Sequence, residues 1–412
     1  MCTTRSTAVI HGGFCCRCGF SLALSLLLAI PMAGCASPQS RSLSPFTAPS
    51  PASPSAPGTS LVRVAFMNVN EGWAVTQSVA GANSLWHSGN GGRTWDNVTP
   101  PGANPPGTSL LAGTDQPIQG AAFLSGMDAW APIMTPTNGS DAVSEAIYAT
   151  EDGGDSWTKV SSVSGGGSQL RFLDATQGFD FVDAGVAAGS SGMALLATAS
   201  GGRTWQVVAS VSLAGPPSDG LYAGCDKTGA GWASPRVGWI GAQCSGGRSL
   251  YFFRTTDGGL SWAAQSLPLP HSLPAEDGYD CMCITTPPDF FGSSNGVELT
   301  TFFPPQVGAQ YVYRTTNGGQ QWQPAPVPTG FGAVDFANFA NWFAVKGRQL
   351  AWTRDSGGQW SVVPSRINLR GAVIDFVNSE VGWAVTSPAG PHPHLMETTD
   401  AGRHWSRRTF PQ

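Results

Sequence analysis

The sequence predicts an all-β fold, a single seven-bladed β-propeller of four-stranded antiparallel blades, because two short motifs alternate along it. The first motif is an eight-residue phrase, Ser/Thr-x-Asp-x-Gly-x-x-Trp or a near variant. The second is an apolar segment that often begins with Gly-Trp or Gly-Phe. Each occurs seven times, at a mean spacing of about 50 residues, which is typical of a four-stranded blade. A unit that repeats in this way cannot bury its apolar face alone and stacks on its neighbours.

The eight-residue phrase is predicted to form the turn between the third and fourth strands of each blade. The Asp carboxylate is expected to accept hydrogen bonds from backbone N–H groups two residues on, while glycine supplies positive φ and the Trp ring is buried. Where Asn or Ser replaces Asp, the cap remains without its charge, so the role is structural rather than metal binding or catalysis. The residues at the Asp position are Asn90, Asp152, Ser200, Asp257, Asn317, Asp355 and Asp400.

The remaining strands of the unit are clearest near the C-terminus. An apolar run at 372–377 is followed by GWAVT (382–386), LMETT (395–399), the phrase and WSRRTF (405–410), which gives four short strands separated by turn residues. The aromatic residue of the second strand is expected to belong to the core rather than to a sugar-stacking platform. The tryptophans at this position are Trp73, Trp130, Trp239, Trp342 and Trp383.

The repeats resemble the BNR or Asp-box β-propellers. Within them, RFLDATQGF (171–179) and DFVNSEVGWAV (375–385), each followed by its phrase, are most similar to the photosynthesis-system-II assembly-factor-like group, and the resemblance covers residues 61–410. It implies a non-catalytic assembly or binding platform without a cofactor. In the plant and cyanobacterial members it also implies an arginine-rich surface, for which this sequence offers no equivalent cluster.

The N-terminal segment predicts a lipid anchor. Arg5 and Arg17 precede an apolar run, Phe20–Ile30, which is too short to span a bilayer, and Met32-Ala33-Gly34 leads into Cys35. The resemblance to bacterial lipoprotein signals implies cleavage after residues 1–34 and lipidation of Cys35. Residues 35–60, rich in Pro, Ser and Ala, would tether the propeller of residues 61–412 to the cell membrane or envelope, outside the cytoplasm.

The composition fits an extracytoplasmic all-β domain. The chain has 53 Gly, 32 Pro and 15 Trp with only 11% charged residues, and this favours a buried core over disorder. A net charge of −5 argues against nucleic acid as a partner, because nucleic-acid recognition needs a basic patch. We expect a monomer that binds a protein or a cell-surface glycan.

Four cysteines of the folded body are predicted to form two disulfides at one end of the strands, namely Cys225, Cys244, Cys281 and Cys283. Sequence leaves three pairings open. Because a Cys-x-Cys pair bonded to itself would be strained, the pairing of Cys281 and Cys283 with Cys225 and Cys244 is favoured. A metal site is the weaker alternative, since no companion histidine or second close pair is present, and none is predicted.

The long loops at the same end form the predicted recognition face. Loops on a rigid scaffold are where binding usually resides, although each of these side chains could simply be solvated. Two histidines around Pro393 lack a third ligand for a metal. The candidate residues are Asp219, Asp226, His271, Glu276, Asp277, Tyr279, Asp280, His392 and His394.

The alternative to a non-catalytic platform is a glycoside hydrolase or glycan-binding protein of the sialidase-like or xyloglucanase-like propeller type. Arg63, Arg171 and Arg370 lie near first strands, but they stand at different distances from the second strand and an Arg-Ile-Pro signature is missing. A hydrolase could instead pair Asp226 with Asp277 or Asp280. The sequence favours a platform that binds its partner without turning it over.

Overall fold

A computed structural model of the chain shows only β-strands as regular elements in the part that it describes. All of this part belongs to the unit Thr47–Gln412. The described residues are 59–78, 83–103, 120–136, 143–164, 168–187, 189–244, 250–270, 282–303, 309–387 and 393–411. The predicted signal segment, the anchor Cys35 and the tether lie outside these ranges.

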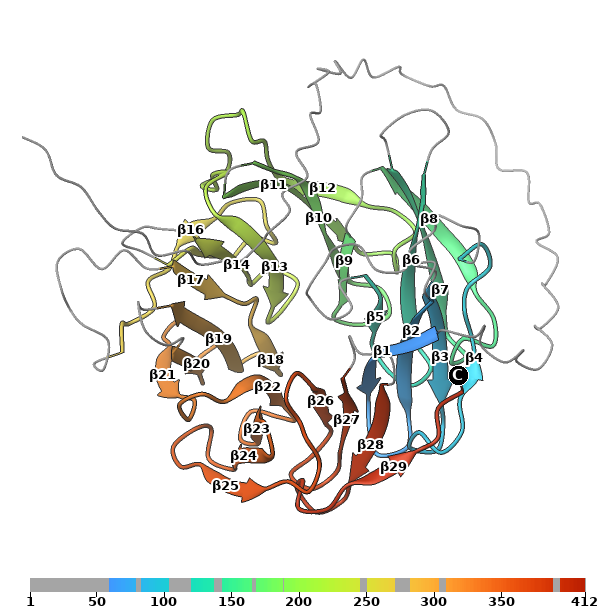
Figure 1. The fold of residues 1–412 in the computed structure, drawn as a ribbon. Helices are drawn as coiled ribbons and strands as arrows, with labels where there is room; N and C mark the ends of the chain where they lie inside the picture. The colour runs from blue at the N-terminus through green and yellow to red at the C-terminus, as the bar shows by residue number, and fades with distance from the viewer. Residues whose placement is uncertain are drawn as a thin grey trace, which may run out of the picture. The chain divides into compact units, whose positions relative to one another are not determined.

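Five antiparallel sheets have four strands each, in chain order from the inner to the outer strand (Figure 1). The first three are β1 (Thr59–Phe66), β2 (Gly72–Ser78), β3 (Asn83–Ser88) and β4 (Asp96–Asn97); β5 (Ala122–Phe123), β6 (Ala129–Pro136), β7 (Val143–Thr150) and β8 (Thr158–Ser164); β9 (Ser168–Phe172), β10 (Gly178–Ala187), β11 (Ser190–Thr198) and β12 (Gln206–Val211). The last two are β22 (Gly332–Phe336), β23 (Trp342–Lys346), β24 (Gln349–Thr353) and β25 (Ser361–Pro364); β26 (Val373–Phe376), β27 (Gly382–Thr386), β28 (His394–Thr398) and β29 (Ser406–Arg408).

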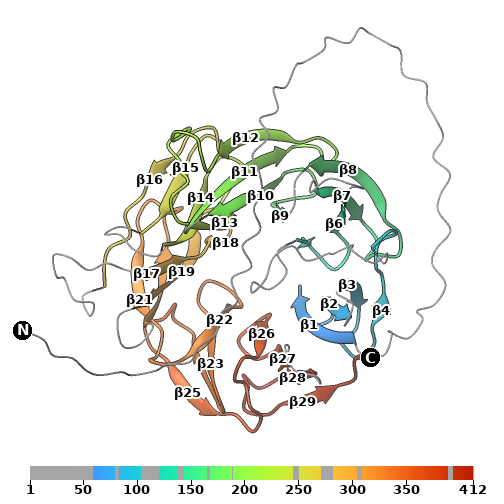
Figure 2. The ribbon, with the colours of Figure 1, turned by 45° about the horizontal axis from the view of Figure 1, so that its top comes forward.

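The middle of the chain forms one nine-stranded sheet that the sequence does not predict. A short strand, β17 (Met282–Thr285), pairs with both β14 and β19 and so joins two four-stranded meanders. The meanders are β13 (Asp226–Trp232), β14 (Gly238–Cys244), β15 (Phe252–Thr255) and β16 (Ala263–Ala264), and β18 (Asp289–Phe291), β19 (Asn295–Phe303), β20 (Ala309–Thr315) and β21 (Gln323–Pro326). The inner strands of successive sheets face a common centre (Figure 2).

Stacked aromatic rings join neighbouring sheets and explain the Gly-Trp motif. Phe66 on β1 lies opposite Gly72 on β2, and a Cβ on Gly72 would stand only 2.3 Å from the Phe66 ring. That ring stacks on Trp383 of the last sheet, with 3.5 Å between centroids. Glycine therefore leaves the space that the inner-strand aromatic occupies. Close stacks of the same kind are Trp130–Phe172, Phe179–Trp232 and Phe343–Phe376.

The first and last sheets close the ring through side-chain packing. Besides the Phe66–Trp383 stack, Trp383 Nε1 donates to the Gly91 carbonyl at 3.3 Å, and Phe66 N donates to Asp375 Oδ2 at 2.6 Å. Each of the two sheets consists of consecutive strands, so neither borrows a strand from the other. Apolar residues of both sheets share one buried cluster.

The repeated phrase forms the same hydrogen-bonded turn in every sheet. In the second sheet, Thr150 Oγ1 donates to Asp152 Oδ1 at 2.7 Å and accepts from Gly154 N at 2.9 Å. Asp152 Oδ1 also accepts from Ser156 N at 2.9 Å. The accepted N–H therefore lies four residues after Asp152, and the expected spacing of two residues is wrong, because the two glycines extend the turn before the chain returns to the carboxylate.

The copies that lack Asp preserve this turn. Ser200 Oγ accepts from Thr204 N at 2.9 Å, so a hydroxyl occupies the place of the carboxylate. In the charged copy at Asp257, hydrogen bonds led by that from the Ser261 side chain lower the pKa of the carboxyl to about 2. These side chains accept hydrogen bonds from residues of their own turns, so their role is structural.

Two buried carboxyl groups meet between the second and third sheets. Glu145 on β7 is 1% exposed and Asp180 on β10 is 0% exposed. Ser168 Oγ contacts Glu145 Oε2 and lies 2.9 Å from Asp180 Oδ2. A serine hydroxyl has only one proton to donate, so the second contact needs a proton on a carboxyl group. Burial, followed by the charge of Glu145, raises the pKa of Asp180 to about 7.

This raised pKa predicts a stability that falls with rising pH. Between the unfolded pKa of about 4 and the folded pKa, the folded state binds more protons, so the free energy of unfolding decreases as pH rises. Asp180→Asn is expected to remove about 2 to 3 kcal/mol of the loss between pH 5 and pH 8, measured by urea unfolding. Buried Glu298, whose pKa burial raises to about 8, adds a dependence that both proteins share.

The matched control is Asp183→Asn, an exposed residue of the same strand. It is expected to keep the wild-type pH dependence. A wild-type slope that persists in Asp180→Asn would show that Asp180 stays ionised in the folded protein.

Candidate active site

The centre of the ring holds a cavity of about 690 Å³ lined by the inner strands. Side chains alternate along a strand, so the residue before each inner-strand aromatic points to the opposite face, toward the cavity. In the first two sheets this position is alanine, Ala65 and Ala122, whereas several later sheets place a charge there. The charged residues that line the cavity are Arg63, Arg171, Asp289, Asp335 and Asp375.

Asp335 and Asp375 occupy the same position on neighbouring inner strands, β22 and β26. Asp335 Oδ2 accepts from Phe376 N at 2.7 Å, and Asp375 Oδ2 accepts from Phe66 N at 2.6 Å. Burial, followed by the charge of Asp375, raises the pKa of Asp335 well above its ordinary value. Burial also raises the pKa of Asp375 to about 6. Burial therefore favours the protonated form of both carboxyl groups, and repulsion from Asp375 adds to this effect at Asp335.

Arg63 on β1 completes this cluster. Burial lowers the pKa of its guanidinium group, while the charges of Asp375 and Asp335 act in the opposite direction. An arginine remains charged even so, because its ordinary pKa is above 12. Arg63 therefore favours the ionised form of the neighbouring carboxyl groups and limits the rise of their pKa values.

A second charged pair faces the same cavity. Arg171 Nη1 on β9 lies 2.7 Å from Asp289 Oδ1 on β18. The two side chains are 44% and 47% exposed. The pair reaches across the inner strand β13, which carries glycines at 229 and 231.

The arrangement fits acid–base chemistry. Two neighbouring carboxyl groups whose pKa values differ can supply a protonated acid and an ionised base or nucleophile in one site. Glycosidic-bond cleavage uses such a pair. Within the described ranges, no group of three or more His, Cys, Asp or Glu side chains could hold a metal ion.

The predicted recognition face is described at only three of its nine residues. Asp226 lies on β13 beside the disulfide, and His394 lies at the start of β28. Neither lines the cavity. Residues His271, Glu276, Asp277, Tyr279, Asp280 and His392 lie outside the described ranges, as do both partners that were considered for Asp226 in a hydrolase.

Asp219 does not lie at the predicted end of the strands. Its carbonyl accepts from Trp262 N at 2.8 Å, and Trp262 follows the turn at the opposite end of β15. Nearby Leu221 is 0% exposed and belongs to the core cluster of the third and fourth repeats. Because Leu221 is buried in this cluster, the loop that carries Asp219 runs along the sheets, away from the disulfide.

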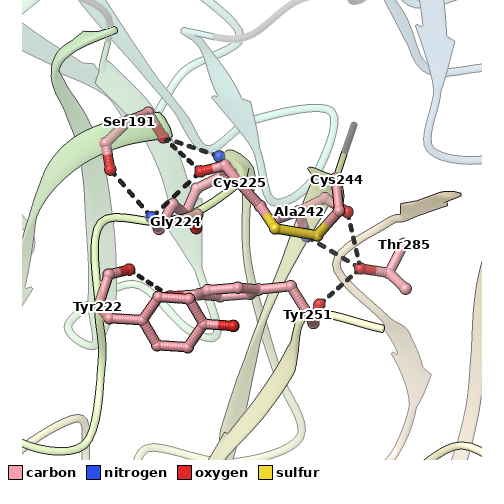
Figure 3. Close-up of a disulfide and its surroundings, with 9 residues drawn as sticks. Ser191, Tyr222, Gly224, Cys225, Ala242, Cys244, Tyr251 and Thr285 are labelled. Atoms are coloured by element: carbon pink, nitrogen blue, oxygen red, sulfur yellow. Dashed lines mark hydrogen bonds between the residues drawn. A yellow bond between two sulfur atoms is a disulfide. The ribbon is translucent and has the colours of Figure 1, made fainter. Parts of the chain in front are cut away.

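The cysteines form a disulfide different from the favoured pairing (Figure 3). Cys225 bonds to Cys244, with 4.5 Å between their Cα atoms. Cys225 directly precedes β13, whose Asp226 pairs with Gln243, so it lies opposite Cys244 on the adjacent strand. The expected bonding of these two cysteines to Cys281 and Cys283 is therefore wrong. Cys283 is also disulfide-bonded, and Cys281 lies outside the described residues.

The residues of the cavity were only partly recognised from sequence. Arg63 and Arg171 were considered and set aside, and the three carboxylates were missed. The signal was present as Asp-Phe at 335–336 and 375–376, where each Asp directly precedes the aromatic residue of the inner strand. Arg370 precedes β26, is exposed and does not line the cavity.

Comparison with known proteins gives structural neighbours only. No protein-family model matches the chain. No curated protein matches it either. In the described part, no helix is long and apolar enough to cross a membrane.

An oligogalacturonate lyase from Vibrio parahaemolyticus is similar with a TM-score of 0.51 at 7% identity, over 83% of this chain and 91% of the lyase. One structure from a study of two prolyl endopeptidases also gives 0.51 at 9% identity, over 85% of this chain and 49% of that one. A GH74 enzyme from Niastella koreensis gives 0.27 at 11% identity, over 84% and 71%. The chain has a β-propeller-like fold. It spans about half the length of the prolyl endopeptidase.

These neighbours correct one expectation from the sequence. The chain was expected not to be an enzyme. This expectation is contradicted by the two named neighbours with a TM-score of 0.51, which are an oligogalacturonate lyase and a structure from the study of prolyl endopeptidases. The expectation rested on the turn phrase, which shapes the scaffold and carries no information about the cavity. At sequence identities this low, structural similarity shows the fold alone.

Proposed function

We propose that this protein is a glycoside hydrolase of the propeller type that cleaves a glycan in its central cavity. The observation that carries the proposal is the pair of carboxyl groups, Asp335 and Asp375, next to Arg63. The cavity volume of about 690 Å³ is within the range of ligand pockets. The similar lyase from Vibrio parahaemolyticus also acts on a carbohydrate, as its name states.

The two carboxyl groups take different roles in this proposal. Asp335, whose pKa burial raises well above its ordinary value, is the acid that donates its proton to the leaving oxygen of the glycosidic bond. Asp375 ionises above a pKa of about 6 and acts as the base or nucleophile. Arg63 stabilises the carboxylate form of Asp375. The hydrogen bonds from Phe66 N and Phe376 N hold both groups in position.

The test is a glycan screen with the purified folded chain. Xyloglucan, arabinan, polygalacturonate and chitin oligosaccharides would be incubated with it, and new reducing ends would be measured together with product masses. We expect at least one glycan to be cleaved. A chain that binds glycans and cleaves none of a broad panel would overturn the catalytic proposal.

We also propose that the blades number seven and that the chain is an Asp-box propeller. The nine-stranded sheet would then represent two blades, with β17 as an insertion between them. Seven copies of the turn phrase support this number. An experimental structure with a different number of four-stranded units around the cavity would contradict it.

We propose further that the chain is a lipoprotein anchored outside the cytoplasm through Cys35. The sequence of the signal segment supports the anchor, and the Cys225–Cys244 disulfide favours an oxidising compartment. In a bacterial host, Cys35→Ala is expected to move the protein from the membrane fraction to the soluble fraction. Membrane association that survives this substitution would exclude the proposed anchor.

A further inference from the structure

We infer that Arg171 is the binding group for a ligand carboxylate, so that the glycan held in the cavity contains a uronic acid. The inference rests on the proposed function, since it names the substrate class of the same cavity. The geometry that points to it is the exposed Arg171–Asp289 pair facing the cavity.

The neighbouring strand β13 makes room for this pair. A Cβ on Gly231 would stand 2.3 Å from the Pro288 carbonyl oxygen, and a Cβ on Gly229 would stand 2.3 Å from Gln169 Oε1. Both positions on β13 therefore lack side chains where the strands on either side approach. As a result, Arg171 on β9 reaches Asp289 on β18 across β13.

Asp289 is a partner that a ligand can replace. A pair whose side chains are 44% and 47% exposed contributes little to stability, and released Asp289 keeps contact with water. Only one guanidinium nitrogen makes the pair at 2.7 Å. A guanidinium group can bind a carboxylate through two parallel hydrogen bonds, which a sugar carboxylate is free to form.

The other charges of the cavity do not oppose an anion. Burial raises the pKa of both Asp335 and Asp375, which lowers the negative charge that the two carry together. Arg63 stands next to them and offsets that charge. A carboxylate ligand at Arg171 therefore meets a cavity in which Arg63 and the raised pKa values limit repulsion from Asp335 and Asp375.

The test compares two probes that differ only in the carboxylate. Trigalacturonic acid and its methyl ester would be titrated calorimetrically into the intact protein. We expect the acid to bind at least about tenfold more tightly than the ester, as a charge-assisted bidentate contact implies. Equal affinities for the two probes would overturn the inference.

Two substitutions should act in opposite directions. Arg171→Gln is expected to abolish the preference for the acid, and Asp289→Asn is expected to strengthen acid binding several-fold because it removes the competing carboxylate. The matched control is Arg203→Gln, an exposed arginine of a turn phrase, which should leave both affinities unchanged. Thermal unfolding would establish that each variant is folded. If Arg171→Gln lowered the melting temperature and kept the preference, Arg171 would be a structural residue only.

The outcomes separate this inference from the proposed function. Cleavage of neutral glycans without acid preference would leave the hydrolase and remove the uronate site. Acid-selective binding without cleavage of any glycan would keep the site and remove the hydrolase.

Discussion

Replacement of Asp335 or Asp375 by asparagine is expected to lower the rate of glycan cleavage by about 10³-fold. Asparagine cannot donate a proton to the leaving group or act as a carboxylate base. It retains a carbonyl oxygen, however, so it can still accept the backbone N–H of Phe376 or Phe66 that binds the aspartate. The loss should therefore appear in kcat with a small change in stability. Initial rates and urea unfolding of the same preparations measure both.

The pH profile of the wild type provides a second measure of the same pair. Activity should rise as Asp375 ionises near pH 6 and fall at higher pH, where Asp335 loses its proton. The exposed residue Asp96 on β4 supplies the control, and Asp96→Asn should keep the wild-type profile. If both cavity variants cleaved glycans at the wild-type rate but unfolded more easily, the two carboxyl groups would serve only to join neighbouring sheets.

The strands and turns were predictable because their causes are local. Glycine opposite an inner-strand aromatic and the hydrogen-bonded phrase act within a few residues, so the sequence shows them directly. No local sequence pattern of this kind predicts the strand β17. It arises where Met282–Thr285 pairs with the ends of β14 and β19 that extend beyond their pairing with β15 and β18. Its Thr285 Oγ1 donates to Tyr251 O at 2.8 Å (Figure 3). Pairing of this kind depends on tertiary position.

The cavity was not predictable in the same way, because its residues come from strands far apart in the sequence. Arg63 and Arg171 were set aside since they stand at different distances from their second strands. The difference is two residues, which is one full period of a strand, so both side chains face the cavity. The carboxylates at 335 and 375 were single polar residues within apolar strands, and only the closed ring brings them next to Arg63.

A large effect on stability is expected from a substitution at the closure of the ring. Trp383→Ala is expected to lower the free energy of unfolding by about 3 to 5 kcal/mol. The Trp383 side chain is 0% exposed, stacks on Phe66 at 3.5 Å and donates to the Gly91 carbonyl. Its removal leaves a cavity between the first and last sheets, which within the described residues are joined by packing and hydrogen bonds. Urea unfolding followed by tryptophan fluorescence would measure the change.

Trp130→Ala is the matched control, since Trp130 is 4% exposed and stacks on Phe172 at 3.6 Å between two sheets that are consecutive in the chain. Both variants should lose similar stability. Hydrogen exchange should separate them: in Trp383→Ala, the amides of β1 and β26 should exchange faster than the rest, because the chain ends can part there. In Trp130→Ala, the fast amides should lie in β6 and β9 instead. The same exchange pattern in both variants would mean that closure at Trp383 is no weaker than the other contacts between sheets.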